Sequence, residues 1–108
     1  MTKTSHNLIM NSLEELKAVD TKILSLKDIS SFTDIMIITS GTSSRHISAI
    51  SDKIQESLKE KSIPIISVEG KGSSEWVLLD LGDIVVNIMS KSARELYDLE
   101  SLWDPDLL

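Results

Sequence analysis

Apolar residues recur at helical spacing in some stretches of this chain and at strand spacing in others. The first stretch has helical spacing and predicts an amphipathic helix that ends near Val19. Residues 22–26 then alternate polar and apolar side chains, which predicts a half-exposed strand. Residues 34–39 contain four consecutive apolar side chains, as in a central strand that is covered on both faces.

A second helix is predicted after Gly41, which ends the central strand. Its apolar residues recur on one face: Ile47, Ile50, Ile54 and Leu58. Three small polar residues before them are candidate N-caps: Thr42, Ser43 and Ser44. A helix that connects two parallel strands of one sheet crosses over in a right-handed sense, so this helix should cover one face of the sheet.

Three further strands are predicted after the second helix. Residues 63–68 form the first, and their Pro64 suits a strand start or an edge strand. Residues 75–81 and 84–89 are apolar runs joined by a Gly-Asp dipeptide. Glycine accepts positive φ, so this dipeptide favours a tight antiparallel hairpin.

The last helix is predicted to begin at Ser92. This serine stands three residues before Glu95, which is the spacing of a capping box. An apolar stripe follows, made of Leu96, Leu99 and Leu102, and the helix should end before Pro105. The predicted order is α-β-β-α-β-β-β-α in a single domain over residues 1–108. We therefore expect an α/β fold, an α-β-α sandwich around a mixed five-stranded sheet.

Charge and aromatic residues concentrate in the last third of the chain. The formal net charge is −6, and residues 1–94 hold every basic residue and 12 of the 17 acidic ones. The excess lies at the end: Glu95, Asp98, Glu100, Asp104 and Asp106. Three of the four aromatic residues lie there too: Trp76, Tyr97 and Trp103. Aromatic anchors beside acidic residues predict a surface for a basic macromolecular partner, whereas the scattered cations argue against sequence-specific binding of nucleic acid.

Several other classes of function are disfavoured by composition. Without cysteine the chain has no disulfide or thiolate site, so the cytoplasm is the expected compartment. The longest apolar runs are too short to span a membrane, and the first residues lack the pattern of a secretory signal. His46 and Arg45 stand at the start of the second helix, where we expect a local structural role. A phosphate-binding role there is a weaker alternative because the segment contains one glycine and one arginine.

The alternative enzyme class is nucleotidyl transfer, because a strand, a small-residue turn and a helix resemble its nucleotide-binding corner. Such enzymes hold two metal ions with paired carboxylates on the next strand, where this chain has Glu69 alone. Asp80 and Asp83 are close in sequence, but the hairpin turn separates them. We therefore expect no catalytic residues, no metal and no cofactor.

Three segments occur in order and at compatible spacing over residues 7–104: S-F-T-D-I-M-I-I-T-S-G-T-S-S-R-H-I, E-G-K-G-S-S-E-W-V-L-L-D-L-G-D-I-V-V-N-I and R-E-L-Y-D-L-E-S-L-W. Together they resemble the ribosomal silencing factor family, also called Iojap-related. The resemblance implies a nucleotidyltransferase-like core without catalytic carboxylates. It also implies a factor that is not an enzyme and binds the intersubunit face of the large ribosomal subunit through a basic protein, large-subunit protein fourteen.

On the same resemblance, the factor would block joining of the small subunit when nutrients are scarce, with a further role in large-subunit biogenesis. The partner-binding residues that it implies are Trp76, Arg94, Glu95, Tyr97, Asp98, Leu99 and Glu100. Strand alternation supports an open position for Trp76, because it shares a face with Asp80, which should avoid the core. A different class of function remains open, a module that forms a homodimer when the protein is free.

Overall fold

A mixed five-stranded sheet with helices on both faces organises the fold, as predicted. The computed structural model describes residues 2–28, 30–31, 33–72 and 75–102. The elements are α1 (Thr2–Glu15), β1 (Val19–Ser25), β2 (Ile35–Ser40), α2 (Ser44–Glu60), β3 (Ser67–Glu69), β4 (Trp76–Asp80), β5 (Ile84–Met89), α3 (Lys91–Tyr97) and α4 (Leu99–Leu102). The strands lie in the order β1-β2-β5-β4-β3, and β2 and β5 are the parallel pair.

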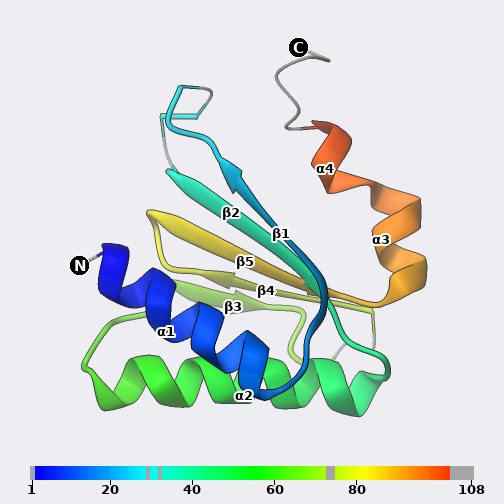
Figure 1. The fold of residues 1–108 in the computed structure, drawn as a ribbon, viewed down its shortest axis with the longest axis horizontal. Helices are drawn as coiled ribbons and strands as arrows, with labels where there is room; N and C mark the ends of the chain where they lie inside the picture. The colour runs from blue at the N-terminus through cyan, green and yellow to red at the C-terminus, as the bar shows by residue number, and fades with distance from the viewer. Residues whose placement is uncertain (1, 29, 32, 73–74, 103–108) are drawn as a thin grey trace.

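Each face of the sheet packs on a different pair of helices (Figure 1). One face packs on α1 and α2, where Ile37 of β2 meets the apolar stripe of α2 in the larger hydrophobic cluster. The other face packs on α3 and α4, where Ile38, Met89 and Ala93 form a smaller cluster. Adjacent residues of β2 thus face opposite layers, which confirms that this strand is covered on both sides.

The β4–β5 hairpin forms as predicted. Gly82 has φ +93° in its turn, a conformation that glycine adopts without steric cost. The Oδ1 atom of Asp80 accepts a hydrogen bond from the Gly82 N–H at 2.8 Å, so this carboxylate stabilises the turn. The strand before the hairpin is shorter than residues 63–68, because pairing with β4 begins only at Ser67. It lies at the edge of the sheet, as its proline suggested.

The first helix ends earlier than predicted. It stops at Glu15, and the chain reverses through Lys17, whose φ is +56°. The Ala18 N–H then donates to the Leu13 carbonyl at 2.9 Å, which satisfies one of the last carbonyls of the helix. No glycine marks this reversal, so the sequence lacks the usual signal for it, and β1 begins at Val19 rather than at residue 22.

The last helix also differs from the prediction. Ser90, not Ser92, is the N-cap of α3, because its Oγ accepts the Ala93 N–H at 3.0 Å. The helix ends at Tyr97, since Asp98 adopts the left-handed conformation with φ 43°. The prediction of one continuous helix with a stripe of leucines is therefore wrong. Leu96, which was expected in that stripe, is 76% exposed.

Candidate partner-binding surface

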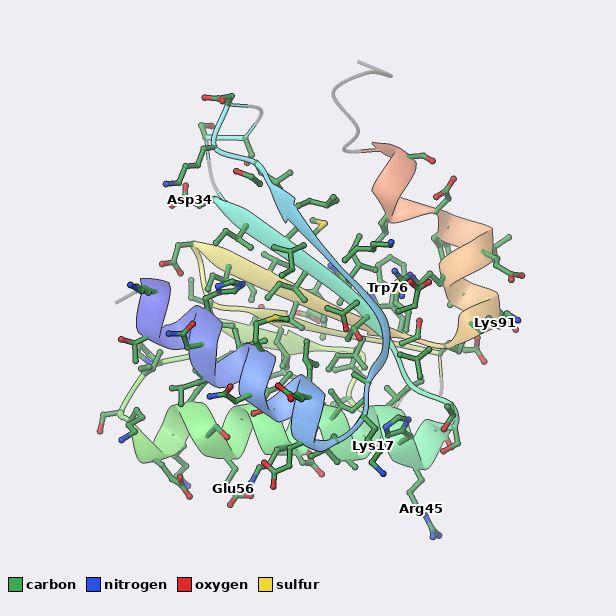
Figure 2. The ribbon with its side chains drawn as sticks, in the orientation of Figure 1. Lys17, Asp34, Arg45, Glu56, Trp76 and Lys91 are labelled. Atoms are coloured by element: carbon green, nitrogen blue, oxygen red, sulfur yellow. The ribbon has the colours of Figure 1, made fainter. Side chains whose placement is uncertain are left out.

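Trp76 lies on the sheet face that α3 and α4 cover, between the sheet and α3 (Figure 2). Its side chain is half-buried, whereas those of Val77 and Leu79, which point to the opposite face, are buried. The prediction that the tryptophan occupies the more open face of the strand is confirmed. The indole Nε1–H of Trp76 donates to Oδ1 of Asn87 at 2.8 Å. The indole is therefore held from beneath by a residue of β5.

Trp76 and Tyr97 form an aromatic pair. Their ring centroids are 4.9 Å apart and their planes are tilted by 46°, and this separation lies within the range of favourable aromatic contacts. Tyr97 is 51% exposed, and Leu96 beside it is more exposed still. Two aromatic residues from distant parts of the sequence thus form one apolar area, of which Tyr97 is the more exposed part.

The start of α3 is tied to the start of β4, and this connection places Tyr97 above Trp76. The Ser90 N–H donates to the Glu75 carbonyl at 2.8 Å, and Ser90 Oγ donates to Oε2 of Glu75 at 2.7 Å. Ser90 also caps the helix, so one serine anchors the helix start to the residue that precedes Trp76. Sequence reasoning did not identify Ser90, because its partner lies 15 residues away.

Acidic residues stand close to the aromatic pair in the sequence. The side chains of Glu75, Glu95 and Asp98 are exposed, and Lys91 is the exposed cation of α3. We call Trp76, Glu95, Leu96, Tyr97 and Asp98 the docking surface. Glu95 does not form the predicted capping box, since the cap is Ser90, and its carboxylate is therefore available at the surface.

Asp98 has a local role that sequence reasoning missed, and Leu99 packs inward as a member of the predicted apolar stripe. Asp98 lies between α3 and α4, where its Oδ2 accepts from Ser101 Oγ at 2.5 Å and its carbonyl accepts from the Ser101 N–H at 3.1 Å. It therefore ends one helix and begins the next. Leu99 is half-buried and packs on the smaller hydrophobic cluster. The side chain of Glu100 and all of Trp103 lie outside the described part of the chain.

Arg94 is the predicted contact that the structure places inside the fold. Its side chain is 8% exposed, and Nη1 donates to Ser40 Oγ at 3.1 Å. Its Nη2 atom is 3.9 Å from Oδ2 of Asp20 in β1. Arg94 therefore connects α3 to the ends of β2 and β1 and presents little surface to a partner.

The segment before α2 has the structural task expected of it. Ser43 is the N-cap, since its Oγ accepts the His46 N–H at 3.1 Å. Nδ1 of His46 accepts the Thr42 N–H at 2.9 Å, so this nitrogen carries no proton, and Nε2 donates to the Leu16 carbonyl at 2.6 Å. His46 thus joins the start of α2 to the end of α1. Arg45 extends away from the helix (Figure 2).

A cavity of about 750 Å³ lies where β2 and β5 end and α2 and α3 begin. Its lining carries charges of both signs. The acidic residues are Asp20, Glu75 and Glu95, and the basic residues are Lys91 and Arg94. Among residues 2–28, 30–31, 33–72 and 75–102, no three His, Cys, Asp or Glu side chains gather closely enough to hold a metal ion. Within the same ranges, no helix combines the length and apolar content needed to span a membrane.

Known proteins resemble this chain over most of its length. A family profile described as "Ribosomal silencing factor during starvation" matches residues 2–106. The ribosomal silencing factor RsfS of Haemophilus influenzae is 41% identical over 95 residues, which are 88% of this chain and 93% of that protein. The mouse protein named mitochondrial assembly of ribosomal large subunit protein 1 is 33% identical over 100 residues, which are 90% of this chain and 44% of that protein.

The fold is shared as well. A crystal structure of a protein from Chromobacterium violaceum matches with a TM-score of 0.90 at 37% identity, covering 94% of this chain and 84% of that one. Sequence and structure therefore agree, and they confirm the resemblance drawn from three short segments. The chain belongs to the ribosomal silencing factor family.

Proposed function

We propose that this protein is a translational repressor that binds the large ribosomal subunit and prevents the small subunit from joining. The observation that carries the proposal is the aromatic pair on the sheet, with Tyr97 half-exposed at a ring distance of 4.9 Å from Trp76. Rings that are held together but open on one side suit the centre of a protein interface. The names of the related proteins, a ribosomal silencing factor and a large-subunit assembly protein, support the choice of partner.

The charge around the rings favours a basic partner. The exposed carboxylates of Glu75, Glu95 and Asp98 flank them, against the single exposed amine of Lys91 among the described residues of α3. Opposite potentials speed association and disfavour wrong partners. Basic proteins cover much of a ribosomal subunit, and large-subunit protein fourteen, at the intersubunit face, is the partner that family resemblance implies.

The mechanism is occlusion, with no bond made or broken. A domain of 12.0 kDa with extents of 36 × 32 × 22 Å occupies space at the seam between two particles, and joining must bury that same area. Affinity for one particle is then enough to inhibit joining. We propose the same docking for a role in maturation of the large subunit, since a bound factor also delays premature joining.

Sedimentation tests the proposal directly. The protein should pellet with isolated large subunits and lower the yield of joined ribosomes in proportion to its occupancy. Trp76→Ala should weaken this binding by about 2 kcal/mol, roughly thirtyfold, if the indole is an interface hot spot. Ile66→Ala is the matched control, because Ile66 is an apolar side chain that is 68% exposed. Its backbone N–H donates to the carbonyl of Asp80, so it lies at the end of β4 opposite to Trp76.

Normal joining at saturating protein would refute occlusion, and equal binding of the tryptophan variant and its control would refute the surface. The expectation that the protein is not an enzyme is tested by calorimetry with nucleotide and Mg²⁺. Nucleotide binding that is lost in Asp80→Ala would favour nucleotidyl transfer instead. Mass in solution, with and without large subunits, tests the homodimer. The exposed side chains of Leu96 and Tyr97 favour self-association of the free protein, which subunit binding would then compete with.

A further inference from the structure

Asn87 is a polar residue in the middle of β5, and it is 1% exposed. The strand register pairs it with Ile38 of β2 on one side and with Leu78 of β4 on the other. Directly paired residues in adjacent strands point to the same face, so two aliphatic side chains flank the amide. An aliphatic residue would suit this position better, and the amide therefore needs an explanation.

The orientation of this amide follows from its partner. An indole nitrogen can only donate a hydrogen bond, so the atom of Asn87 that faces Trp76 must be the oxygen. The amide nitrogen, Nδ2, then points elsewhere, and it is buried without an acceptor among the groups that the structure describes. A buried donor that lacks an acceptor lowers the stability of a fold. Asn87 thus costs stability in order to accept one bond.

That bond helps to fix how the indole lies. Trp76 is half-buried, and the hydrogen bond from its Nε1–H to the buried Asn87 restrains rotation of the ring. The ring of Tyr97 meets the indole in the orientation that this bond sets. A side chain that is already held in its bound orientation loses less freedom when a partner binds.

We propose that Asn87 is a positioning residue of the docking surface, which holds the indole of Trp76 in the orientation that the partner recognises. The inference rests on the proposed function, because it assumes that Trp76 contacts the large subunit. Asn87 itself is buried and touches no partner. It acts through the tryptophan alone.

The experiment compares the unsubstituted protein with two variants at Asn87, and a Trp76→Phe sample identifies which indole N–H signal belongs to Trp76. Asn87→Leu removes the acceptor and also the buried amide. Asn87→His keeps an acceptor, since its Nδ1 atom occupies the position of the asparagine Oδ1. Solvent exchange of the indole N–H, measured by ¹H–¹⁵N NMR, reports the hydrogen bond. Binding to isolated large subunits and the thermal midpoint are measured on the same samples.

We expect Asn87→Leu to melt no lower than the unsubstituted protein, to lose protection of the indole N–H, and to bind large subunits about three- to tenfold more weakly. Asn87→His should restore both protection and binding. If Asn87 had only a structural role, Asn87→Leu would lower the melting temperature and the affinity together. The histidine variant therefore distinguishes positioning from stability.

Each other outcome overturns either this inference or the proposed function. Unchanged affinity in Asn87→Leu, with normal binding of the unsubstituted protein, overturns the inference and leaves the proposed function intact. Absence of binding by the unsubstituted protein overturns the proposed function, and the inference with it. If Asn87→Leu does not fold, Asn87→Val, which is smaller and favoured in strands, replaces it. Failure of both to fold shows a structural role and overturns the inference.

Discussion

Replacement of Ser90 by alanine tests where the last helix begins. The structure has its N-cap at Ser90, whereas the sequence predicts a capping box at Ser92. Ser90 Oγ accepts the Ala93 N–H at 3.0 Å and donates to the carboxylate of Glu75 at 2.7 Å. Ser90→Ala removes both bonds and leaves the backbone intact. Ser92→Ala is the matched control, because a capping box would use Ser92, whereas the structure places it in the first turn of α3 with an exposed side chain.

The expected loss follows from these two bonds. An N-cap serine contributes about 1 kcal/mol, and a hydrogen bond to an exposed carboxylate adds about 0.5 kcal/mol after screening by solvent. Unfolding entropy scales with length and is roughly 0.23 kcal/mol/K for a domain of this size. Ser90→Ala should therefore lower the melting temperature by about 6.5 °C. Ser92→Ala should change stability by less than about 0.5 kcal/mol, since alanine suits a helix and no described bond is lost.

Thermal unfolding followed by far-ultraviolet circular dichroism measures both variants, and urea titration gives their free energies of unfolding. The reasoning is refuted if Ser92→Ala is the more destabilised of the two. It is also refuted if the two variants are equally stable, because the N-cap would then not depend on Ser90. Greater destabilisation of Ser92→Ala would instead favour the predicted capping box of Ser92 and Glu95 as the start of the helix.

Two further predictions concern stability. Gly70→Ala should destabilise the protein more than Gly72→Ala in urea titration. Both glycines have positive φ, so alanine is strained at either position. Only at Gly70 would the new Cβ also clash with the Trp76 carbonyl oxygen, because Gly72 faces open space. Equal losses would contradict this packing. His46→Ala should cost about 1–2 kcal/mol through its lost bond to the segment after α1, whereas Arg45→Ala, an exposed neighbour, should cost less than about 0.5 kcal/mol in the same titration.

The elements that the sequence predicted well depend on local patterns. The β4–β5 hairpin follows from two apolar runs and a glycine that adopts positive φ, and all of these lie within one short segment. The central strand follows from consecutive apolar residues, because a strand with both faces covered has no polar side. The edge position of β3 follows from a proline near its start. Each inference used residues that are neighbours in the chain.

The elements that the sequence misplaced depend on distant residues or on unmarked backbone conformations. The sequence predicted Ser92 as the cap, whereas the structure uses Ser90, whose side chain also bonds to Glu75, the residue before β4. Lys17 and Asp98 adopt positive φ without being glycine, so neither helix end was visible. Arg94 looks like a surface charge in sequence, but it is buried against Ser40.

The candidate site divides in the same way. Sequence alone determined that Trp76 lies on the open face of its strand, because alternation puts it with Asp80 rather than with the core residues, and it determined that the acidic excess follows it. Only the tertiary structure decided that Tyr97 packs on the indole and that Asn87 holds it from beneath. Side-chain period is a local property of the backbone. Contacts between strands and helices depend on register and packing, which arise only when distant segments meet.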